Sequence, residues 1–237
     1  MSELPIHPTG YLLINKPVDW TSHDVVAYMR GVTKIKKIGH AGTLDPFATG
    51  LLIVAVGRAA TKHIDSFKTF SKVYEATMIC GATSNTQDLT GTITEYIPTR
   101  ELPIPQSEVE EVLQTFTGKL QQIPPMFSAK KIKGQKLYEL ARKGEVVERQ
   151  PNTITISQNE LLNYNWPEIA LRAEVSTGSY IRTLCHDIGE ALGVGAYCSE
   201  LTRTSIGPYK LADAIGPKDF TPENWTERLL NPELPTL

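Results

Sequence analysis

A short segment of the chain concentrates the residue types that could do chemistry. Residues 39–50 contain three glycines, a histidine and a single carboxylate, Asp45, which is followed by Pro46. A carboxylate can act as a nucleophile or as a general base, and a glycine-rich loop could present it at the floor of a cleft. An Asp-Pro pair is also common in turns, because aspartate hydrogen-bonds to nearby backbone and proline fixes φ. The spacing alone leaves both roles open.

The one clearly basic stretch lies between Gly118 and Pro151, where lysine and arginine outnumber glutamate. Runs of charge usually form a solvated face of a protein. Here two aromatic residues, Phe127 and Tyr138, lie among the cations, and such mixing is typical of segments that contact phosphates and bases. The cations are Lys130, Lys131, Lys133, Lys136, Arg142, Lys143 and Arg149.

The composition favours a single cytoplasmic domain. The 237 residues can bury a sizeable core, and no linker or repeat divides them. The net charge of −2 shows no global basic excess, so any RNA-binding surface must be a local patch. The N-terminus resembles no signal peptide, and no apolar run is long enough to cross a membrane. Cys80, Cys185 and Cys198 form no CxxC pair and are predicted to be buried residues, not disulfide partners or zinc ligands.

Short strands and helices that alternate irregularly predict an α+β fold with a central, mostly antiparallel sheet flanked by helices. The regular strand-helix repeat of a doubly wound fold is absent. Strands are expected at residues 10–15, 51–56, 73–80, 92–97, 152–157, 169–175 and 205–211, and helices at 21–30, 60–67, 107–118 and 180–192.

Local signals mark where some of these elements begin. Thr21 with Asp24, and Ser107 with Glu110, match the capping box that opens a helix. Residues 33–49 are expected to form the irregular loop that carries the carboxylate described above. The proline-containing segment from residue 217 onward is expected to be peripheral.

Several motifs, in order along the chain, resemble the TruB-type tRNA pseudouridine synthases, which modify the uridine at tRNA position 55. GHAGTLDPFATGLL at residues 39–52 is similar to the catalytic motif of that family. The other similar segments are INKP at 14–17, KVY at 72–74, QIPPMFSAKK at 122–131, LYELARKG at 137–144, TGSYIRT at 177–183 and LTR at 201–203.

The resemblance implies a pseudouridine synthase fold with a basic thumb inserted at about residues 119–151. It implies an isomerase that works on the T arm of tRNA by flipping one uridine out of the loop, with no metal, no cofactor, no membrane and no obligate protein partner. Asp45 would be the nucleophile, adding to ribose C1′ or to uracil C6, or abstracting the 2′ proton to give a glycal. The residues do not choose among these routes.

The resemblance also assigns the other site residues. Arg182 would hold the carboxylate of Asp45 bidentately and keep it ionised, since burial alone favours the neutral acid. Tyr74 would stack on the extruded uracil and relay the proton that leaves C5. The substrate-binding residues would be Lys16, His40, Tyr180, Lys130, Lys131, Lys133 and Lys136. Without the resemblance, a surface arginine and a core tyrosine would be the simpler interpretations of Arg182 and Tyr74.

Two features depart from the family pattern. Asn85 stands where an acid is expected in the segment at residues 83–91, and the residues after Leu211 are too few to form the PUA RNA-binding domain of many members. A guide-RNA particle subunit is therefore a less fitting interpretation than a stand-alone enzyme. A tRNA-folding chaperone is a second function that could coexist with catalysis.

Overall fold

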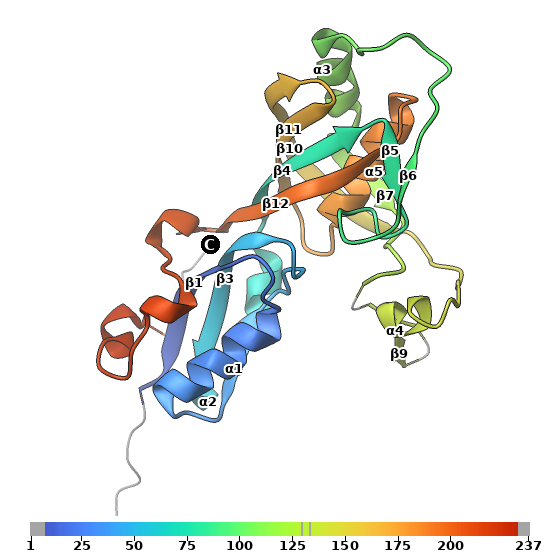
Figure 1. Cartoon of the computed structure of the whole chain (residues 1–237). Coiled ribbons are helices and arrows are strands. Elements are labelled where there is room, and N and C mark those ends of the chain that lie inside the picture. The colour runs from blue at the N-terminus through green and yellow to red at the C-terminus, as the bar shows by residue number, and fades with distance from the viewer. Residues whose placement is uncertain (1–7, 129, 133, 232–237) are drawn as a thin grey trace, which may run out of the picture. The chain divides into compact units, whose positions relative to one another are not determined.

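The computed structural model describes residues 8–128, 130–132 and 134–231, and their contacts divide the chain into two compact units. One unit combines the residues up to 72 with those from 202 onward, and is called the Asp45 unit here. The other comprises residues 73–201 and is called the Arg182 unit. Helices accompany a mixed sheet of nine strands, which confirms the predicted α+β class (Figure 1).

The sheet of the Asp45 unit is centred on strand β3, Thr49–Val56. Strand β1, Gly10–Lys16, pairs antiparallel with it over its whole length. Strand β2, Ile38–Ala41, is also antiparallel to β3, and the end of strand β12, Ala196–Ile206, joins it in parallel through Thr202 and Arg203. Strand β13, Tyr209–Lys210, then turns back on β12.

Alternation along β1 and β3 gives this sheet two buried faces. Leu12, Leu52 and Val54 face helix α1, Ser22–Thr33, together with Val25 and Met29 of that helix. The intervening residues, such as Leu13 and Ile53, pack with helix α2, Gly57–Thr61, and the 3₁₀ helix η1, Ile64–Thr69. Because both faces are covered, β3 is an almost uninterrupted apolar run, as its sequence predicts.

Helix α1 begins as predicted, with a capping box. The Thr21 hydroxyl accepts from the Asp24 N–H at 3.0 Å, and the Asp24 carboxylate accepts from the Thr21 N–H at 2.8 Å. The prediction of an irregular loop over residues 33–49 is wrong in part, because β2 lies inside it. The predicted helix over residues 60–67 is instead split between α2 and η1.

The Arg182 unit continues the sheet in the order β12, β4, β11, β10, β7. Figure 1 labels these strands and the helices α3 and α5 of this unit. The strands and helices are β4, Lys72–Cys80; β5, Ala82–Ser84; β6, Ile93–Glu95; α3, Gln106–Thr115; β7, Gly118–Gln122; β8, Lys131–Ile132; β9, Gln135–Lys136; α4, Leu137–Ala141; β10, Asn152–Asn165; β11, Glu168–Val175; and α5, Ile181–Ala191.

Two local predictions for this region are wrong. Helix α3 starts at Gln106 after Pro105 without a side-chain cap, so the second capping-box match does not operate. The strand predicted at residues 205–211 is divided between β13 and the end of β12, and β12 begins nine residues before the predicted start at 205. Its buried positions include the polar residues Arg203 and Ser205, which hides the apolar alternation on which the prediction depended. The three cysteines are buried free thiols, as predicted, and burial raises the pKa of Cys80 to about 12.

The expectation that the C-terminal segment is peripheral is wrong. From residue 217 onward, its described part contains the 3₁₀ helices η3 at Pro217–Asp219 and η4 at Trp225–Arg228, and η2 at Leu211–Asp213 precedes them. Phe220 and Trp225 are 2% and 5% exposed and belong to the same apolar cluster as Leu12 and Met29. The segment therefore completes the core of the Asp45 unit. In the described part of the chain, no helix has the length and apolar character needed to cross a membrane.

Replacing Trp225 by alanine should destabilise the protein by about 3–5 kcal/mol, because it removes a large buried ring and leaves a cavity. Urea unfolding followed by circular dichroism measures the loss. The neighbouring exposed Thr226 provides the matched control, and Thr226→Ala should change the free energy of unfolding by less than about 0.5 kcal/mol. Equal effects of the two substitutions would contradict the core role of Trp225.

Candidate active site

The loop that carries Asp45 is fixed by side chains from other parts of the Asp45 unit. The Ser22 hydroxyl accepts from the Leu44 N–H at 2.9 Å and donates to the Leu44 carbonyl at 3.2 Å. The Pro46 carbonyl accepts from the Asp19 N–H at 2.9 Å. The backbone on both sides of the half-buried Asp45 is therefore held, and its carboxylate is carried on an ordered turn.

The buried ammonium group of Lys16 also holds this turn, by hydrogen bonds to backbone carbonyls. Lys16 is 0% exposed, and its Nζ donates to the carbonyls of Pro17 at 2.9 Å, Trp20 at 2.6 Å and Pro46 at 3.2 Å. Three carbonyl acceptors satisfy all three protons of the ammonium group. Lys16 is thus a structural support of the loop, and its predicted contact with the substrate stays a prediction.

Arg203 holds the other end of the loop. Its side chain is 2% exposed, with Nε donating to the Leu51 carbonyl at 2.7 Å and Nη2 to the Gly42 carbonyl at 3.2 Å. Gly50 allows β12 to pair closely with the start of β3, since a Cβ at position 50 would lie 2.4 Å from the Arg203 carbonyl oxygen. A positive φ of 100° at Gly50 also favours glycine there.

Within its own unit, Asp45 lies close enough to the Lys16 ammonium for the two charges to attract each other. Burial lowers the pKa of Lys16 to about 8, and the Asp45 carboxylate opposes this shift. The same Coulomb attraction stabilises the ionised form of Asp45 for as long as Lys16 keeps its proton. Burial also lowers the pKa of His40, and His23, whose ring centroid is 6.0 Å away, acts in the same direction. His40 is therefore neutral at pH 7.

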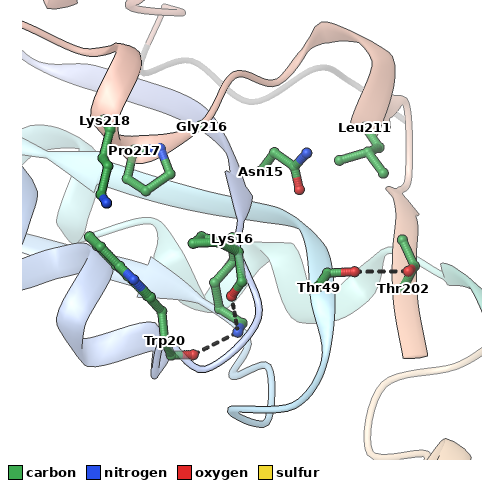
Figure 2. A pocket seen from close by; sticks show the side chains of 10 residues that line it. Asn15, Lys16, Trp20, Thr49, Thr202, Leu211, Gly216, Pro217 and Lys218 are labelled. Atoms are coloured by element: carbon green, nitrogen blue, oxygen red, sulfur yellow. Dashed lines mark hydrogen bonds between the residues drawn. The ribbon is translucent and has the colours of Figure 1, made fainter. Parts of the chain in front are cut away.

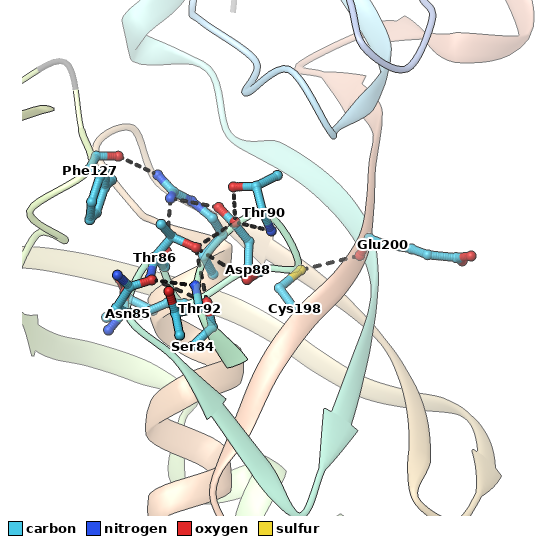
Figure 3. Close-up of polar contacts among 12 residues, drawn as sticks. Ser84, Asn85, Thr86, Asp88, Thr90, Thr92, Phe127, Cys198 and Glu200 are labelled. Carbon is cyan, nitrogen blue, oxygen red and sulfur yellow. Dashed lines mark hydrogen bonds and ion pairs between the residues drawn. The ribbon is translucent and has the colours of Figure 1, made fainter. Parts of the chain in front are cut away.

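Arg182 lies in the first turn of α5 and is 3% exposed. Figure 3 shows three of the residues that it contacts, Thr86, Asp88 and Phe127. Nη1 donates to the Asp88 carboxylate at 2.9 Å and to the Thr86 carbonyl at 3.0 Å, and Nη2 donates to the Phe127 carbonyl at 2.9 Å. The simple interpretation of Arg182 as a surface charge is therefore wrong. Asp45 belongs to the other unit, so the pairing of Arg182 with Asp45 stays a prediction.

Asp88 is itself fixed by its neighbours. Its Oδ1 accepts from the Thr86 hydroxyl at 2.7 Å, the Thr90 hydroxyl at 2.6 Å and the Thr90 N–H at 2.9 Å (Figure 3). Asn85, the departure from the family pattern, accepts from the Thr92 N–H at 2.9 Å through its amide oxygen. An amide oxygen thus supplies the acceptor that this turn needs.

Tyr180 precedes α5, and Gln122 holds its backbone. The Tyr180 N–H donates to Gln122 Oε1 at 2.8 Å, while Gln122 Nε2 donates to the Tyr180 carbonyl at 3.0 Å. Gln122 is 4% exposed and ends β7, near the start of the basic stretch. Two contacts therefore join the first part of this stretch to the start of α5: those of Gln122 with the Tyr180 backbone, and that of the Phe127 carbonyl with Arg182.

The remaining predicted site residues are spread over the Arg182 unit. Tyr74 lies partly buried in β4. Lys130 donates to Asn152 Oδ1 at 2.6 Å and so connects the basic stretch to β10. Lys131 and Lys136 belong to β8 and β9, but their side chains, and Lys133 altogether, lie outside the described residues. Among the residues described, no cluster of His, Cys, Asp or Glu could hold a metal ion.

Four supporting residues were missed or undervalued in the sequence: Ser22, Asp88, Gln122 and Arg203. Each is a polar residue buried to at least nine-tenths and bonded to a distant segment of the chain. Burial of a polar side chain requires such partners, but the local pattern of a sequence does not show which they are. The family-like segments at residues 83–91, 122–131 and 201–203 contain Asp88, Gln122 and Arg203, but no role was predicted for any of these residues.

Family models cover nearly all of the chain. The model of the TruB family pseudouridylate synthase N-terminal domain matches residues 30–181, and that of the tRNA pseudouridylate synthase B C-terminal domain matches residues 182–234. The tRNA pseudouridine synthase B of Protochlamydia amoebophila is 45% identical over 97% of this chain and 87% of its own. That of Geobacter sulfurreducens is 49% identical over 87% of this chain and 67% of its own.

Solved structures show the same fold. A chain of an H/ACA ribonucleoprotein bound to a substrate RNA containing 2′-deoxyuridine superposes with a TM-score of 0.68 at 26% identity. The match covers 94% of this chain and 59% of that one, so the chain spans about three-fifths of the length of this structural relative. Together with the family models, this likeness confirms the predicted pseudouridine synthase fold.

The low pKa of Lys16 gives a pH dependence of stability with a definite sign. Between the folded value of about 8 and the ordinary value of 10.5, the unfolded chain keeps a proton that the folded chain has released, so stability rises with pH. The free energy of unfolding of the wild type, relative to Lys16→Met, should therefore increase as the pH is raised from about 8 toward 10.5.

Urea titrations at stepped pH measure this difference. Lys72, whose pKa burial also lowers to about 8, is present in both proteins and cancels. A difference that stays constant over the interval would mean that Lys16 keeps an ordinary pKa.

Proposed function

Because this chain belongs to the TruB family of pseudouridylate synthases, we propose that it converts uridine to pseudouridine in the T loop of tRNA, at position 55. The curated relatives at 45% and 49% identity are named for the tRNA reaction. The guide-RNA particle chain is less similar, at 26% identity. The stand-alone tRNA enzyme, an isomerase that needs no protein partner, is therefore the favoured assignment.

The reaction moves one carbon atom of uracil into the place of a nitrogen atom. The N1–C1′ bond breaks, the base rotates, and C5 bonds to C1′; C5 then loses its proton and N1 gains one. No electrons are gained or lost overall. The uridine must first leave the stacked loop, at a cost of a few kcal/mol that contacts with the protein have to offset.

The ordered turn around Asp45 is the single observation that carries the assignment of the nucleophile. Ser22, Lys16 and Arg203 all hold its backbone, so the carboxylate can be aimed with little loss of side-chain freedom. Asp45 adds to ribose C1′ or to uracil C6, or removes the 2′ proton. All three routes use an ionised carboxylate, which the Lys16 ammonium favours.

Arg182 and the two tyrosines complete the proposed site. We assign Arg182 to the Asp45 carboxylate, which a planar guanidinium can hold bidentately and keep ionised. Tyr74 stacks on the flipped uracil and relays the C5 proton, and Tyr180 forms a wall of the pocket. Neutral His40 contacts the RNA loop around the vacated position.

The basic stretch serves as the thumb that grips the T arm. Arg142 lies over the ring of Tyr138, 5.4 Å from its centroid, so cations and an aromatic face are presented together at α4. Such a surface can contact phosphates and unstacked bases at once. The bond of Lys130 to Asn152 fixes the base of the thumb, and phosphate contacts fall mainly to the other cations.

The direct test is release of tritium from tRNA labelled with [5-³H]uridine, by purified protein with no metal or cofactor added. Release of about one tritium per tRNA, lost when position 55 is replaced by cytidine, is the expected result. Binding without release would favour a chaperone that only refolds the T arm.

Asp45→Asn should reduce tritium release to the background of the assay, while the affinity for tRNA changes less than about tenfold. The carboxylate does the covalent chemistry, whereas phosphates and stacking supply most of the binding energy. Filter binding and single-turnover assays measure the two quantities separately. Appreciable turnover by this variant would exclude Asp45 as nucleophile, and any chaperone activity should survive the substitution.

Arg182→Lys should lower the single-turnover rate at least about a hundredfold, because a point ammonium cannot replace the planar fork that reaches several acceptors. Arg172→Lys is the matched control. Arg172 is an exposed arginine of the same unit that pairs with Glu75, and its replacement should leave the rate within about twofold. A near-normal rate for Arg182→Lys would remove Arg182 from the proposed chemistry.

A further inference from the structure

The Asp45 unit contains a pocket to which the proposed function assigns no role. It has a volume of about 520 Å³ and is shown in Figure 2. This volume falls within the range of roughly 300–1,000 Å³ typical of small-molecule sites. The lining residues come from the turn after β1, the start of β3, the end of β12 and the C-terminal segment; among them are Trp20, Thr49, Thr202 and Lys218.

The pocket offers polar groups that no other described residue engages. The Trp20 indole N–H, the Asn15 amide and the Lys218 ammonium each line it without a side-chain hydrogen bond or ion pair to any described residue. By contrast, the ammonium of Lys16, which also lines the pocket, is bonded to carbonyls. Lys218 therefore provides the available positive charge, and it is exposed to solvent.

The character of the lining selects one class of ligand. An indole face suits stacking with a base, a lysine suits a phosphate, and an asparagine amide suits the edge of a base. The hydroxyls of Thr49 and Thr202, 2.8 Å apart, add donor and acceptor capacity. No aspartate or glutamate lines the pocket, so an anionic ligand meets no direct repulsion there.

We propose that this pocket binds an unpaired nucleotide of the RNA substrate, distinct from the uridine that reacts. The base stacks on Trp20 and its phosphate contacts Lys218. The inference rests on the proposed function, since it takes RNA as the substrate.

The pocket adjoins the catalytic loop through shared residues. Lys16 lines the pocket and holds the Pro46 carbonyl, while Thr49 ends the loop that Asp45 occupies. Thr202 directly precedes Arg203, which holds Gly42. A nucleotide bound here is thus anchored to the same rigid framework as Asp45, and it helps to fix the register of the RNA on this unit.

Binding measurements on exposed-residue variants test the proposal. Lys218→Ala should weaken the binding of unmodified full-length tRNA by about three- to tenfold and reduce the slope of log K against log salt by roughly 0.7–0.9. Lys62→Ala, which removes an exposed lysine of the same unit outside the pocket, should change neither quantity. Trp20→Leu should weaken binding by on the order of tenfold, and Trp20→Tyr, which keeps an aromatic face, should retain most of the affinity.

The same variants are compared on the T-arm stem-loop and titrated with UMP by indole fluorescence. A loss seen only with full-length tRNA assigns the nucleotide to a part of the RNA outside the T arm, and a loss with both assigns it to the T arm. Unchanged RNA affinity in Lys218→Ala and Trp20→Leu overturns the proposal, whether or not UMP binds. Failure of the proposed function is recognised separately, by the absence of tritium release from the wild-type protein.

Discussion

The architecture of the Asp45 unit depends on the hydrogen bonds of the buried Arg203 guanidinium to the Leu51 and Gly42 carbonyls. This guanidinium joins the parallel pairing between β12 and β3 to the loop that carries Asp45. Gly50 makes the approach possible, because any side chain there would collide with the Arg203 backbone. The geometry of the carboxylate is therefore set by a residue 158 positions away in the chain, and not by the turn sequence itself.

Buried cations recur around the proposed site, and each is satisfied in its own way. Lys16 and Arg203 use backbone carbonyls, whereas Arg182 combines carbonyls with the Asp88 carboxylate. The three carbonyls around the Lys16 ammonium stabilise it without neutralising its charge, so this charge attracts the nearby Asp45 carboxylate. A carboxylate partner, such as Asp88 beside Arg182, holds a guanidinium more firmly but cancels part of its field.

Much of the fold could be predicted from the sequence because it depends on local patterns. The capping box of Thr21 and Asp24 and the apolar run of β3 both form as predicted. The motif around Asp45 also led to the proposed nucleophile, which stays a prediction. The supports could not be predicted: Arg203, which holds the Asp45 turn, and Asp88 and Gln122, which hold Arg182 and Tyr180, are polar positions whose partners lie far away in the chain. Trp225 was missed for a related reason: isolated aromatic residues in a proline-rich segment show no periodicity, although they fill the core.

The Asp45 unit is assembled from the two ends of the chain, and this has a consequence for its synthesis. During translation, residues 8–72 emerge first, but Arg203, Phe220 and Trp225 follow only after the whole Arg182 unit has been made. The Asp45 turn thus lacks one of its supports, and the core beneath it stays open, until the last residues leave the ribosome. Contacts between such distant segments are also slow to form, because loop closure must precede them. A chain assembled in this way cannot fix the Asp45 turn fully before Arg203 has been made, so shorter nascent fragments should lack the ordered turn.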